Sequence, residues 1–392
     1  MMKIERILYA SHRYHTNQVP IMKGWYEKGV KVKFLAQYQG ISEVHDYVEY
    51  HQLSPSLLTI VYNWIADKIY DSSIAERKKS VFFLPSFFDT FKQIHEFKPQ
   101  LVILRSRSRC NAIICLACKL IGIKYIINYT QTELFTSVKR TKHLGSIAKI
   151  IFPEVGYTPV LYRGDYREKD IIPQEWFHPH YFIPLVGEIS QTPPKNFFKD
   201  NVINLLDVGK YRPYKNHFFL IDALSEVKHK KRFRLTIIGQ LSQDAKRSYY
   251  NNLKKYIADK GLSDIVSVNA NVPFREMDAI YESADVLVLP SKLETAGMVI
   301  LEAMAKGLCV MSSNNCGLAC YLEESSCGFV FNLQDTNQLV EQLNRISEDR
   351  DIILKYAEEA RKVVRNNYSF ENYYERLKFL MSDFFQENIY TE

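Results

Sequence analysis

The sequence alternates short apolar runs with longer amphipathic stretches, and it does so in both halves of the chain. Runs rich in Val, Ile and Leu are typical of strands in a parallel sheet, and the stretches between them are typical of crossover helices. The pattern therefore predicts an α/β protein. The expected strands are Ile7–Ala10, Val32–Leu35, Leu101–Leu104, Tyr125–Asn128 and Tyr157–Leu161, then Val202–Val208, Leu235–Ile238, Val266–Val268, Val286–Leu289 and Cys309–Met311.

A chain of 392 residues is too long for one ordinary core, so two domains are expected. We predict a doubly wound, Rossmann-like domain over 1–187 and a second one over 188–369, with a linker near Ser190–Lys195. A helix of about residues 370–392 is expected to pack back on the first domain. Open parallel sheets bind ligands at the carboxyl ends of their strands, which places the expected site in a cleft between the domains.

Charge is distributed unevenly along the chain. Residues 1–186 hold 25 Lys and Arg against 16 Asp and Glu, a net charge of +9, and the remainder holds 26 against 28, a net charge of −2. A basic surface favours anionic partners such as nucleic acid, a phosphorylated small molecule or an anionic lipid surface. An ordinary solvated surface with additional lysines is an equally good interpretation.

Several classes of protein are disfavoured by what the sequence lacks. No apolar run approaches the roughly 18 residues of a membrane span, and neither a Gly-x-Gly-x-x-Gly nor a Walker sequence occurs. Seven cysteines, mostly within apolar runs, suggest reduced thiols in a cytoplasmic protein. Cys110, Cys115 and Cys118 have a spacing that is typical of iron–sulfur sites, but a helix would place two of them on a buried apolar face, and Asp349–Asp351 is interpreted as a cap, so no metal site is expected.

The turn after the first strand of the second half carries positive charge. Gly209 permits a tight turn, and Lys210 and Lys215 place two point charges within reach of one anion. A surface turn with ordinary lysines explains the same residues, so this turn predicts an anion site only in combination with other features.

The segment Leu289–Glu302 runs from a strand through a loop into a helix that should begin near Thr295–Gly297. The unpaired amides of residues 296–298 and the positive end of the helix dipole would stabilise a diphosphate. Glu302 lies one turn beyond Met298, where its carboxylate can accept hydrogen bonds from sugar hydroxyls. Glu294, in the loop, can reach a neighbouring group.

From about Val202 to Leu333 the chain resembles the donor-binding domain of retaining GT-B glycosyltransferases of family 4, the glycosyl transferases group 1. The resemblance rests on Glu294 and Glu302, which are separated by seven residues, and on the Gly-basic-x4-Lys turn at 209–215. The accompanying motifs are Pro290–Ser291, Ala303–Gly307 and Ile238–Gly239.

This resemblance implies that the catalytic residues are Glu294, on the hydroxyls of the transferred sugar, and Lys210 and Lys215, on the leaving diphosphate. Glu302 would bind the ribose, and Asn271–Pro273 would lie beside the base. The expected donor-binding residues are Gly209, Gly239, Val272, Pro273, Thr295, Ala296, Gly297, Met298 and Glu302. The donor is a co-substrate, and neither a metal nor a cofactor is expected, because the lysines and the helix start supply the positive charge.

The chain departs from the family pattern at several positions. Lys210 stands where the family usually has Arg, so a point charge replaces a bidentate fork. Ala296 stands where an aromatic residue is common, and Gln131 stands where many relatives have a histidine. The first half resembles the family only in outline. The candidates there for a cleft that binds the acceptor are His12, Arg13, His15 and Gln131, although capping or packing explains the first three equally well.

The resemblance implies a retaining hexosyltransferase. It would move a sugar from a UDP- or GDP-sugar to a glycan or lipid-linked acceptor bound by the N-terminal domain, in the synthesis of a cell-surface polysaccharide such as lipopolysaccharide or capsule. Nucleic acid is not expected as a partner. A sugar-nucleotide epimerase or phosphorylase on the same fold, and a non-catalytic GT-B subunit that supports a partner transferase, remain as alternatives.

The segment 76–88 joins a basic cluster to a run of aromatic residues. One interpretation is a peripheral contact with an anionic membrane, at the inner face of the cell membrane, where lipid-linked acceptors are held. A core helix with a charged start is the other interpretation.

Overall fold

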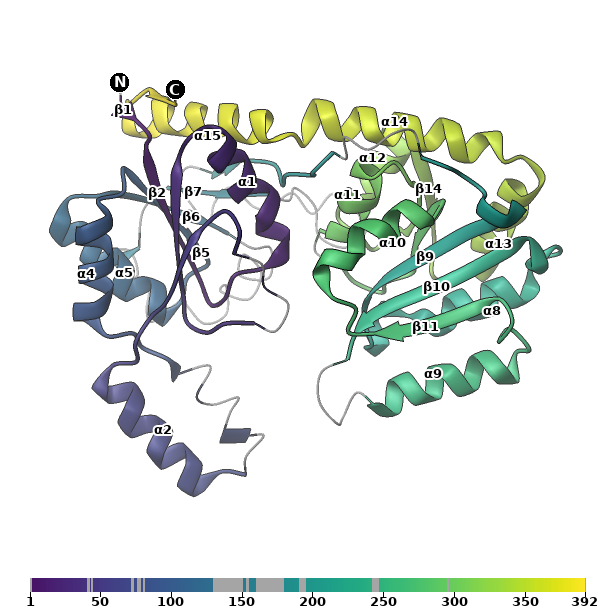
Figure 1. Cartoon of the computed structure of the whole chain (residues 1–392), viewed down its shortest axis with the longest axis horizontal. Coiled ribbons are helices and arrows are strands. Elements are labelled where there is room, and N and C mark those ends of the chain that lie inside the picture. The colour runs from purple at the N-terminus through teal and green to yellow at the C-terminus, as the bar shows by residue number, and fades with distance from the viewer. Residues whose placement is uncertain are drawn as a thin grey trace. The chain divides into compact units, whose positions relative to one another are not determined.

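The computed structural model describes residues 2–40, 43, 45–71, 74–75, 79, 82–129, 151–152, 155–159, 180–189, 195–241, 247–294 and 296–391. The chain divides into two compact units (Figure 1). The N-terminal unit comprises Met1–Pro159, Pro173–Val186 and Phe370–Glu392, and the C-terminal unit comprises Val160–Ile172 and Gly187–Ser369.

The N-terminal unit is built on a parallel sheet of seven strands in the order β4-β3-β2-β5-β6-β7-β8. The strands are β2 (Arg6–Ser11), β3 (Lys31–Ala36), β4 (Glu49–Gln52), β5 (Leu101–Arg105), β6 (Lys124–Asn128), β7 (Gly156–Thr158) and β8 (His180–Phe182). A separate parallel pair joins β1 (Met2–Lys3) to β15 (Ile389–Tyr390). The helices are α1 (Val19–Glu27), α2 (Leu57–Ile69), α4 (Phe87–Phe97), α5 (Arg109–Ile121) and α15 (Phe370–Phe385).

The last helix, α15, belongs to the core of the N-terminal unit. Its buried residues Tyr373, Leu377 and Met381 join the cluster that contains Trp25 of α1 and Tyr9 of β2. The Trp25 indole N–H donates to the Tyr9 hydroxyl at 2.7 Å, and the Tyr9 and Tyr373 hydroxyls lie 2.9 Å apart. These buried polar groups are therefore satisfied by one another, as burial requires.

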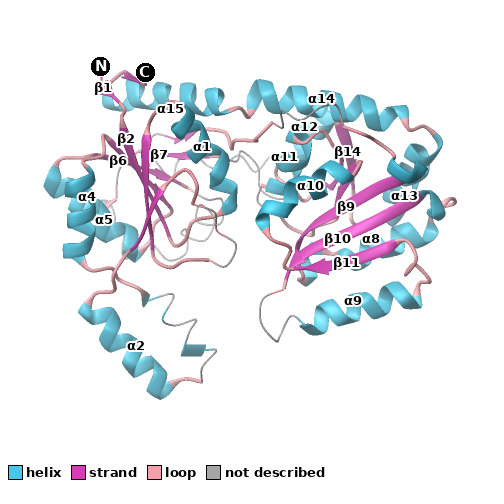
Figure 2. Ribbon diagram, viewed as in Figure 1, coloured by secondary structure: helices cyan, strands magenta, loops and turns pink. Residues whose placement is uncertain are grey.

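The C-terminal unit is built on a parallel sheet of six strands in the order β11-β10-β9-β12-β13-β14. The strands are β9 (Ile203–Lys210), β10 (Phe233–Gln240), β11 (Val266–Ala270), β12 (Val286–Leu289), β13 (Cys309–Ser313) and β14 (Gly328–Phe331). The α-helices are α8 (His217–Glu226), α9 (Arg247–Asp259), α10 (Met277–Ser283), α11 (Met298–Ala305), α12 (Ala319–Glu324), α13 (Thr336–Glu348) and α14 (Asp351–Asn367). Figure 2 shows the strands gathered into two sheets with helices beside each.

Both sheets reverse their strand order at one point, between the first strand and the fourth in sequence. In the C-terminal unit this switch lies between β9 and β12, and in the N-terminal unit it lies between β2 and β5. Ligands of doubly wound sheets bind beyond the carboxyl ends of the strands at such a switch. The predicted α/β class with two parallel-sheet domains is confirmed, and the fold directs attention to the loops after β9 and β12.

Local predictions were wrong in some places. A 3-10 turn over Thr16–Gln18 leads directly into α1, and Gln18 is the residue before that helix. The strands β4, β8 and β14 were not predicted. Among the described residues, no helix is long and apolar enough to cross a membrane.

Candidate functional site

Charged and glycine residues meet at the switch point of the C-terminal sheet. Gly209 and Lys210 end β9, and they pair in register with Gly239 and Gln240 at the end of β10. The chain after β12 brings Glu294 to the same edge, because the Lys292 amide donates to the carbonyl of Tyr214, which precedes Lys215, at 2.7 Å. Two loops that are remote in sequence are thus joined at the position where a doubly wound fold binds its ligand.

Lys215 and Glu294 form an ion pair at this edge. The Lys215 side chain is only 9% exposed and that of Glu294 19%, and Ser291 Oγ donates to Glu294 Oε1 at 3.3 Å. Burial favours the neutral amine, but the attraction and hydrogen bond of Glu294, together with the attraction of Asp207, outweigh it and the pKa of Lys215 is raised. The structure therefore keeps a buried ammonium charged and oriented, which is what an anionic ligand requires.

The loop that carries Glu294 is held firmly by the chain after β13. The Glu294 amide donates to the Asn315 carbonyl at 3.0 Å, and the Gly317 amide donates back to the Glu294 carbonyl at 3.2 Å. Ser313 Oγ donates to the Ser291 carbonyl at 2.6 Å. Because these bonds fix the backbone on both sides, the Glu294 carboxylate has a defined direction.

Two further polar side chains lie beneath this pair in the core. Asp207 of β9 and His217 of α8 are both fully buried, and His217 Nε2 lies 3.8 Å from Asp207 Oδ2. Neither carboxyl oxygen of Asp207 has a hydrogen-bond partner among the described residues. Burial raises the pKa of Asp207 to about 7 and lowers that of His217 to about 3. Lys215 is thus paired with the partly exposed Glu294 and interacts electrostatically with a buried acid.

The short helix α11 presents its amino end beyond β12. It begins at Met298, one residue later than the predicted start, after Gly297 in the left-handed region at φ 74°. A glycine adopts this conformation without strain. Amides before the first i to i−4 bond of a helix can face a ligand, and in α11 that of Ile300 instead donates to the Gly297 carbonyl at 2.8 Å. The Leu318 amide donates to the Ala296 carbonyl at 3.0 Å and holds this approach in place. The arrangement can stabilise an anion.

Glu302 lies on α11 one turn after Met298. Tyr281 of α10, itself buried, donates its hydroxyl to Glu302 Oε2 at 2.7 Å. Burial raises the pKa of Glu302, and this hydrogen bond acts in the opposite direction. One oxygen of the carboxylate is therefore fixed by tyrosine, which leaves Oε1 to accept from hydroxyls of a ligand.

The glycines of the site are needed for close approach. A Cβ atom on Gly209 would stand 2.8 Å from Cε of Lys215, and one on Gly239 would stand 2.6 Å from the Gly209 carbonyl oxygen. A side chain at either position would displace the lysine or separate the strand ends. The two predicted glycines thus serve the packing around Lys215.

The other predicted donor-binding residues belong to the ends of β9 and β11 and to the loop before α11. Lys210 is exposed at the end of β9, whereas Lys215 is buried, so the two lysines differ in environment. Val272 and Pro273 follow β11, where the Asn271 amide donates to the Gly239 carbonyl at 2.9 Å. Thr295 lies outside the described residues.

The acceptor candidates belong to the N-terminal unit. His12, Arg13 and His15 follow β2 at its switch point, and the backbone of His12 accepts from the amides of Gln37 and Tyr38. Desolvation, with a contribution from Arg105, lowers the pKa of His12. The amide of His15 donates to the side chain of Gln18 at 3.2 Å, which is the capping arrangement that was one of its two interpretations. Gln131 lies outside the described residues.

Sequence reasoning missed three residues of the C-terminal site. Asp207 could have been noticed as a single acid inside an apolar strand, and His217 as a polar residue at the buried start of a helix. Tyr281 gives no such indication, because it lies 21 residues before Glu302 and only the fold brings them together. No group of three or more His, Cys, Asp or Glu side chains that could hold a metal occurs in the part of the chain that the structure describes.

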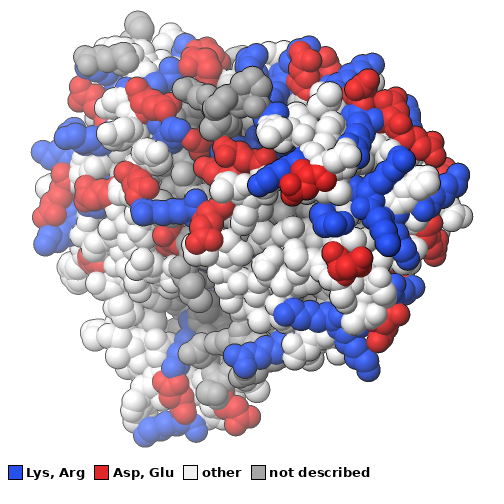
Figure 3. All heavy atoms as spheres, turned by 45° about the vertical axis from the view of Figure 1, so that its right-hand side comes forward, with Lys and Arg blue, Asp and Glu red and all other residues white. Residues whose placement is uncertain are grey.

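The surface of the molecule carries both signs of charge. Figure 3 shows Lys and Arg interspersed with Asp and Glu on the face that it draws, without a continuous block of one sign. This mixture agrees with the near balance of 26 basic and 28 acidic residues after residue 186. The lysines at the C-terminal site are Lys210 and Lys215, with the exposed Lys292 on the adjoining loop.

Comparison with known families assigns the C-terminal unit. Residues 188–367 match the family model of glycosyl transferases group 1. The chain carries a glycosyl transferases group 1 domain. The chain is 25% identical to a lipopolysaccharide 1,2-N-acetylglucosaminetransferase of Salmonella typhimurium over 188 residues, which are 47% of the chain. It is 29% identical to the lipopolysaccharide glucosyltransferase WaaG of Escherichia coli over 172 residues, which are 43% of the chain. The matches span 49% and 43% of those relatives, so less than half of each is covered.

Solved structures extend the likeness to the whole fold. A glycosyltransferase from Rickettsia africae has a TM-score of 0.69 at 17% identity, and Anabaena Alr3699/HepE in complex with UDP has a TM-score of 0.69 at 15% identity. Each covers 97% of this chain, and the matches cover 99% and 100% of those chains. The chain thus has the predicted GT-B fold, with two Rossmann-like domains.

Proposed function

We propose that this chain is a retaining glycosyltransferase that moves a sugar from a nucleotide-diphosphate sugar to a glycan or lipid-linked acceptor. The observation that carries the proposal is the buried Lys215–Glu294 pair at the switch point, beside the amino end of α11 and the Glu302 carboxylate. The cation and the helix amides at this sheet edge can bind a diphosphate, and the two carboxylates can accept hydrogen bonds from the sugar hydroxyls on either side of it.

In the proposed reaction the bond between the anomeric carbon and the diphosphate oxygen breaks, and a bond to the acceptor oxygen forms on the same face of the sugar. The proton of the acceptor hydroxyl passes to the departing diphosphate. The departing nucleoside diphosphate gains negative charge. Lys215, Lys210 and the amino end of α11 stabilise that charge, Glu294 accepts from hydroxyls of the transferred sugar, and Glu302 accepts from the ribose. The donor base lies beside Val272 and Pro273. No metal is required in this scheme.

The acceptor and its location are the finer part of the proposal. Two of the similar proteins are named for lipopolysaccharide synthesis, and one similar structure contains UDP, which supports a UDP-sugar donor and an acceptor of a cell-surface polysaccharide pathway. The N-terminal unit, with His12, Arg13 and His15, would bind the acceptor. The enzyme would act in the cytoplasm, peripherally at the inner face of the cell membrane.

Calorimetric titration of the purified protein with UDP, GDP and ADP, in the presence of a chelator, tests the donor site. We expect one nucleoside diphosphate to bind selectively, Glu302→Ala to abolish that binding, and Glu341→Ala, at an exposed position of α13, to leave it unchanged. Binding of no nucleotide would favour a non-catalytic subunit. Binding that requires a divalent cation would contradict the metal-independent scheme.

Retention is tested by following the slow hydrolysis of the selected donor sugar by proton NMR. The first product formed should have the anomeric configuration of the donor. Formation of the opposite anomer would refute retention, and release of an epimerised sugar nucleotide would favour the epimerase alternative.

A further inference from the structure

The helix α2 of the N-terminal unit exposes an apolar surface to solvent. Seven of its apolar side chains are between 39% and 81% exposed, while its buried positions are Thr59 and Ala66. The exposed side chains are Leu57, Leu58, Ile60, Val61, Trp64, Ile65 and Ile69. A surface helix of a soluble domain normally has the reverse arrangement, and exposed apolar patches of this kind mark sites of interaction.

A second helix contributes to the same surface. Pro55 and Pro85 form an isolated antiparallel bridge, and each is followed by a serine that caps a helix, Ser56 for α2 and Ser86 for α4. Phe88, three residues after its proline, is 84% exposed, and Leu58, three residues after its own, is 68% exposed. The two helices therefore begin side by side, each with exposed apolar residues in its first turn.

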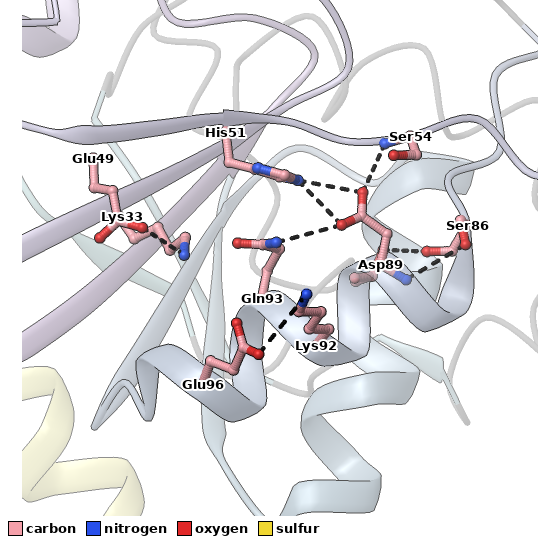
Figure 4. A network of polar contacts seen from close by, with 10 residues as sticks. Lys33, Glu49, His51, Ser54, Ser86, Asp89, Lys92, Gln93 and Glu96 are labelled. Atoms are coloured by element: carbon pink, nitrogen blue, oxygen red, sulfur yellow. Dashed lines mark hydrogen bonds and ion pairs between the residues drawn. The ribbon is translucent and has the colours of Figure 1, made fainter.

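The paired amino ends of α2 and α4 are held in place by hydrogen bonds. Asp89 of α4 accepts from the Ser54 amide at 2.8 Å and lies 3.2 Å from His51 Nε2 of β4, as Figure 4 shows. Thr59 exchanges hydrogen bonds with the backbone of Leu84 on the other strand of the bridge, at 2.8 and 2.9 Å. Since α2 is fixed at its amino end, its exposed face is a feature of the folded unit.

Charge indicates what covers this face. Lys68, on the same side of α2 as Trp64, places its ammonium 3.7 Å from the Trp64 ring centroid, whereas Lys79 forms an ion pair with Asp67 of α2. Arg77 and Lys78, which lie outside the described residues, add two more basic residues to the sequence after α2. The first 186 residues carry a net charge of +9, which would repel a second copy of the same surface and attract an anionic one. Tryptophan, aliphatic side chains and lysine on one face are the composition of helices that lie in a lipid interface.

We propose that α2, together with Phe88, lies in the interfacial layer of an anionic bilayer and holds the N-terminal unit there. This proposal places the membrane contact on α2 and Phe88, where the sequence had suggested the segment 76–88, and it depends on the exposed face and not on the donor chemistry. The 13 residues of α2 would lie along the surface. At about 1.5 Å per residue they reach about 20 Å, less than the hydrocarbon thickness of about 30 Å.

Co-sedimentation of the full chain with vesicles tests the proposal. The probes are vesicles of phosphatidylcholine with phosphatidylglycerol and vesicles of phosphatidylcholine alone. We expect binding to the anionic vesicles, a loss of about tenfold or more for the double variant Ile60→Glu with Trp64→Glu, and little loss for Leu116→Glu with Leu120→Glu on α5. The two pairs have the same spacing and the same substitution. Ile60 and Trp64 are 50% and 60% exposed, and Leu116 and Leu120 are 44% and 65% exposed.

Three outcomes would overturn the proposal. They are equal loss for the two double variants, indifference of the wild-type chain to anionic vesicles, and a wild-type dimer that the α2 variant converts to a monomer without any vesicle binding. Titration of the α2 variant with the nucleoside diphosphate separates this proposal from the donor site, because donor binding should be unchanged. Loss of vesicle binding with intact nucleotide binding supports the membrane contact even if transfer activity is never found.

Discussion

Replacing Asp207 by Asn should stabilise the protein, and the gain should grow with pH. The carboxyl group of Asp207 is fully buried, and burial raises its pKa to about 7 from an ordinary value of 3.8. In the unfolded chain it ionises near 3.8, so its contribution to the free energy of unfolding falls as pH rises from about 4 to about 7. At 1.36 kcal/mol per unit of pKa, the full loss is about 4 kcal/mol.

The neighbouring His217 masks this dependence in the wild-type protein. Its pKa is lowered to about 3, so its contribution to stability is present above pH 6.5 and is lost as pH falls toward 3. Between about pH 4 and 6.5 the two slopes oppose each other. The difference between the Asp207→Asn variant and the wild type therefore isolates the aspartate, because His217 is present in both.

Denaturant unfolding followed by circular dichroism at pH 5 and pH 8 measures that difference. We expect the variant to exceed the wild type by about 2 kcal/mol at pH 5 and by about 4 kcal/mol at pH 8. Asp264→Asn, at an exposed aspartate of the same unit, should change little at either pH. A gain that is independent of pH, or a variant less stable than the wild type at pH 8, would refute the reasoning.

Three further predictions concern the donor site. Gly209→Ala places a Cβ 2.8 Å from the flexible end of Lys215, so calorimetry should show about a tenfold loss of nucleoside diphosphate affinity. The free energy of unfolding in denaturant should change by less than about 1 kcal/mol, because the lysine side chain can move aside. A large loss of stability would contradict this prediction. Tyr281→Phe removes the 2.7 Å hydrogen bond to Glu302. Because a hydrogen bond to a charged group contributes about 1.5–3 kcal/mol, nucleotide affinity should fall at least tenfold. Unchanged affinity in the same titration would contradict this prediction. Lys215→Met removes the cation paired with Glu294, and donor turnover in steady-state kinetics should fall roughly 100-fold or more. A fall of less than about threefold would exclude a role of Lys215 at the leaving group.

The sheets could be predicted from sequence because their inner strands are continuous apolar runs. The strand β5, for example, reads Leu101-Val-Ile-Leu104 and all four side chains are buried. The edge strand β4 reads Glu49-Tyr-His-Gln52 and is half exposed, so neither composition nor alternation identifies it. Edge strands are specified by the neighbour with which they pair, and sequence alone does not name that neighbour.

The site could be predicted only where its residues follow a strand in the chain. Gly209, Lys215, Glu294 and Glu302 were proposed as site residues because they lie at the end of β9 or in the chain after β9 and β12, and because a resemblance points to the same residues. Asp207 was not found, because its importance comes from burial beside residues of another helix and loop. The α2 surface was missed for a similar reason, since apolar residues on a short helix predict a core position until the fold shows that face exposed.

The buried charges of the C-terminal unit are best understood as a cost to stability that serves ligand binding. The low polarity that raises the pKa of Asp207 also strengthens the attraction between Lys215 and any phosphate, because both effects follow from the exclusion of water. Asp207 adds to the forces that keep Lys215 charged. Its removal should therefore weaken nucleotide binding while it stabilises the fold, which is the opposition expected of a functional residue. An Asp207→Asn variant that gained stability without losing any affinity would instead make Glu294 the only residue that prepares Lys215 for its ligand.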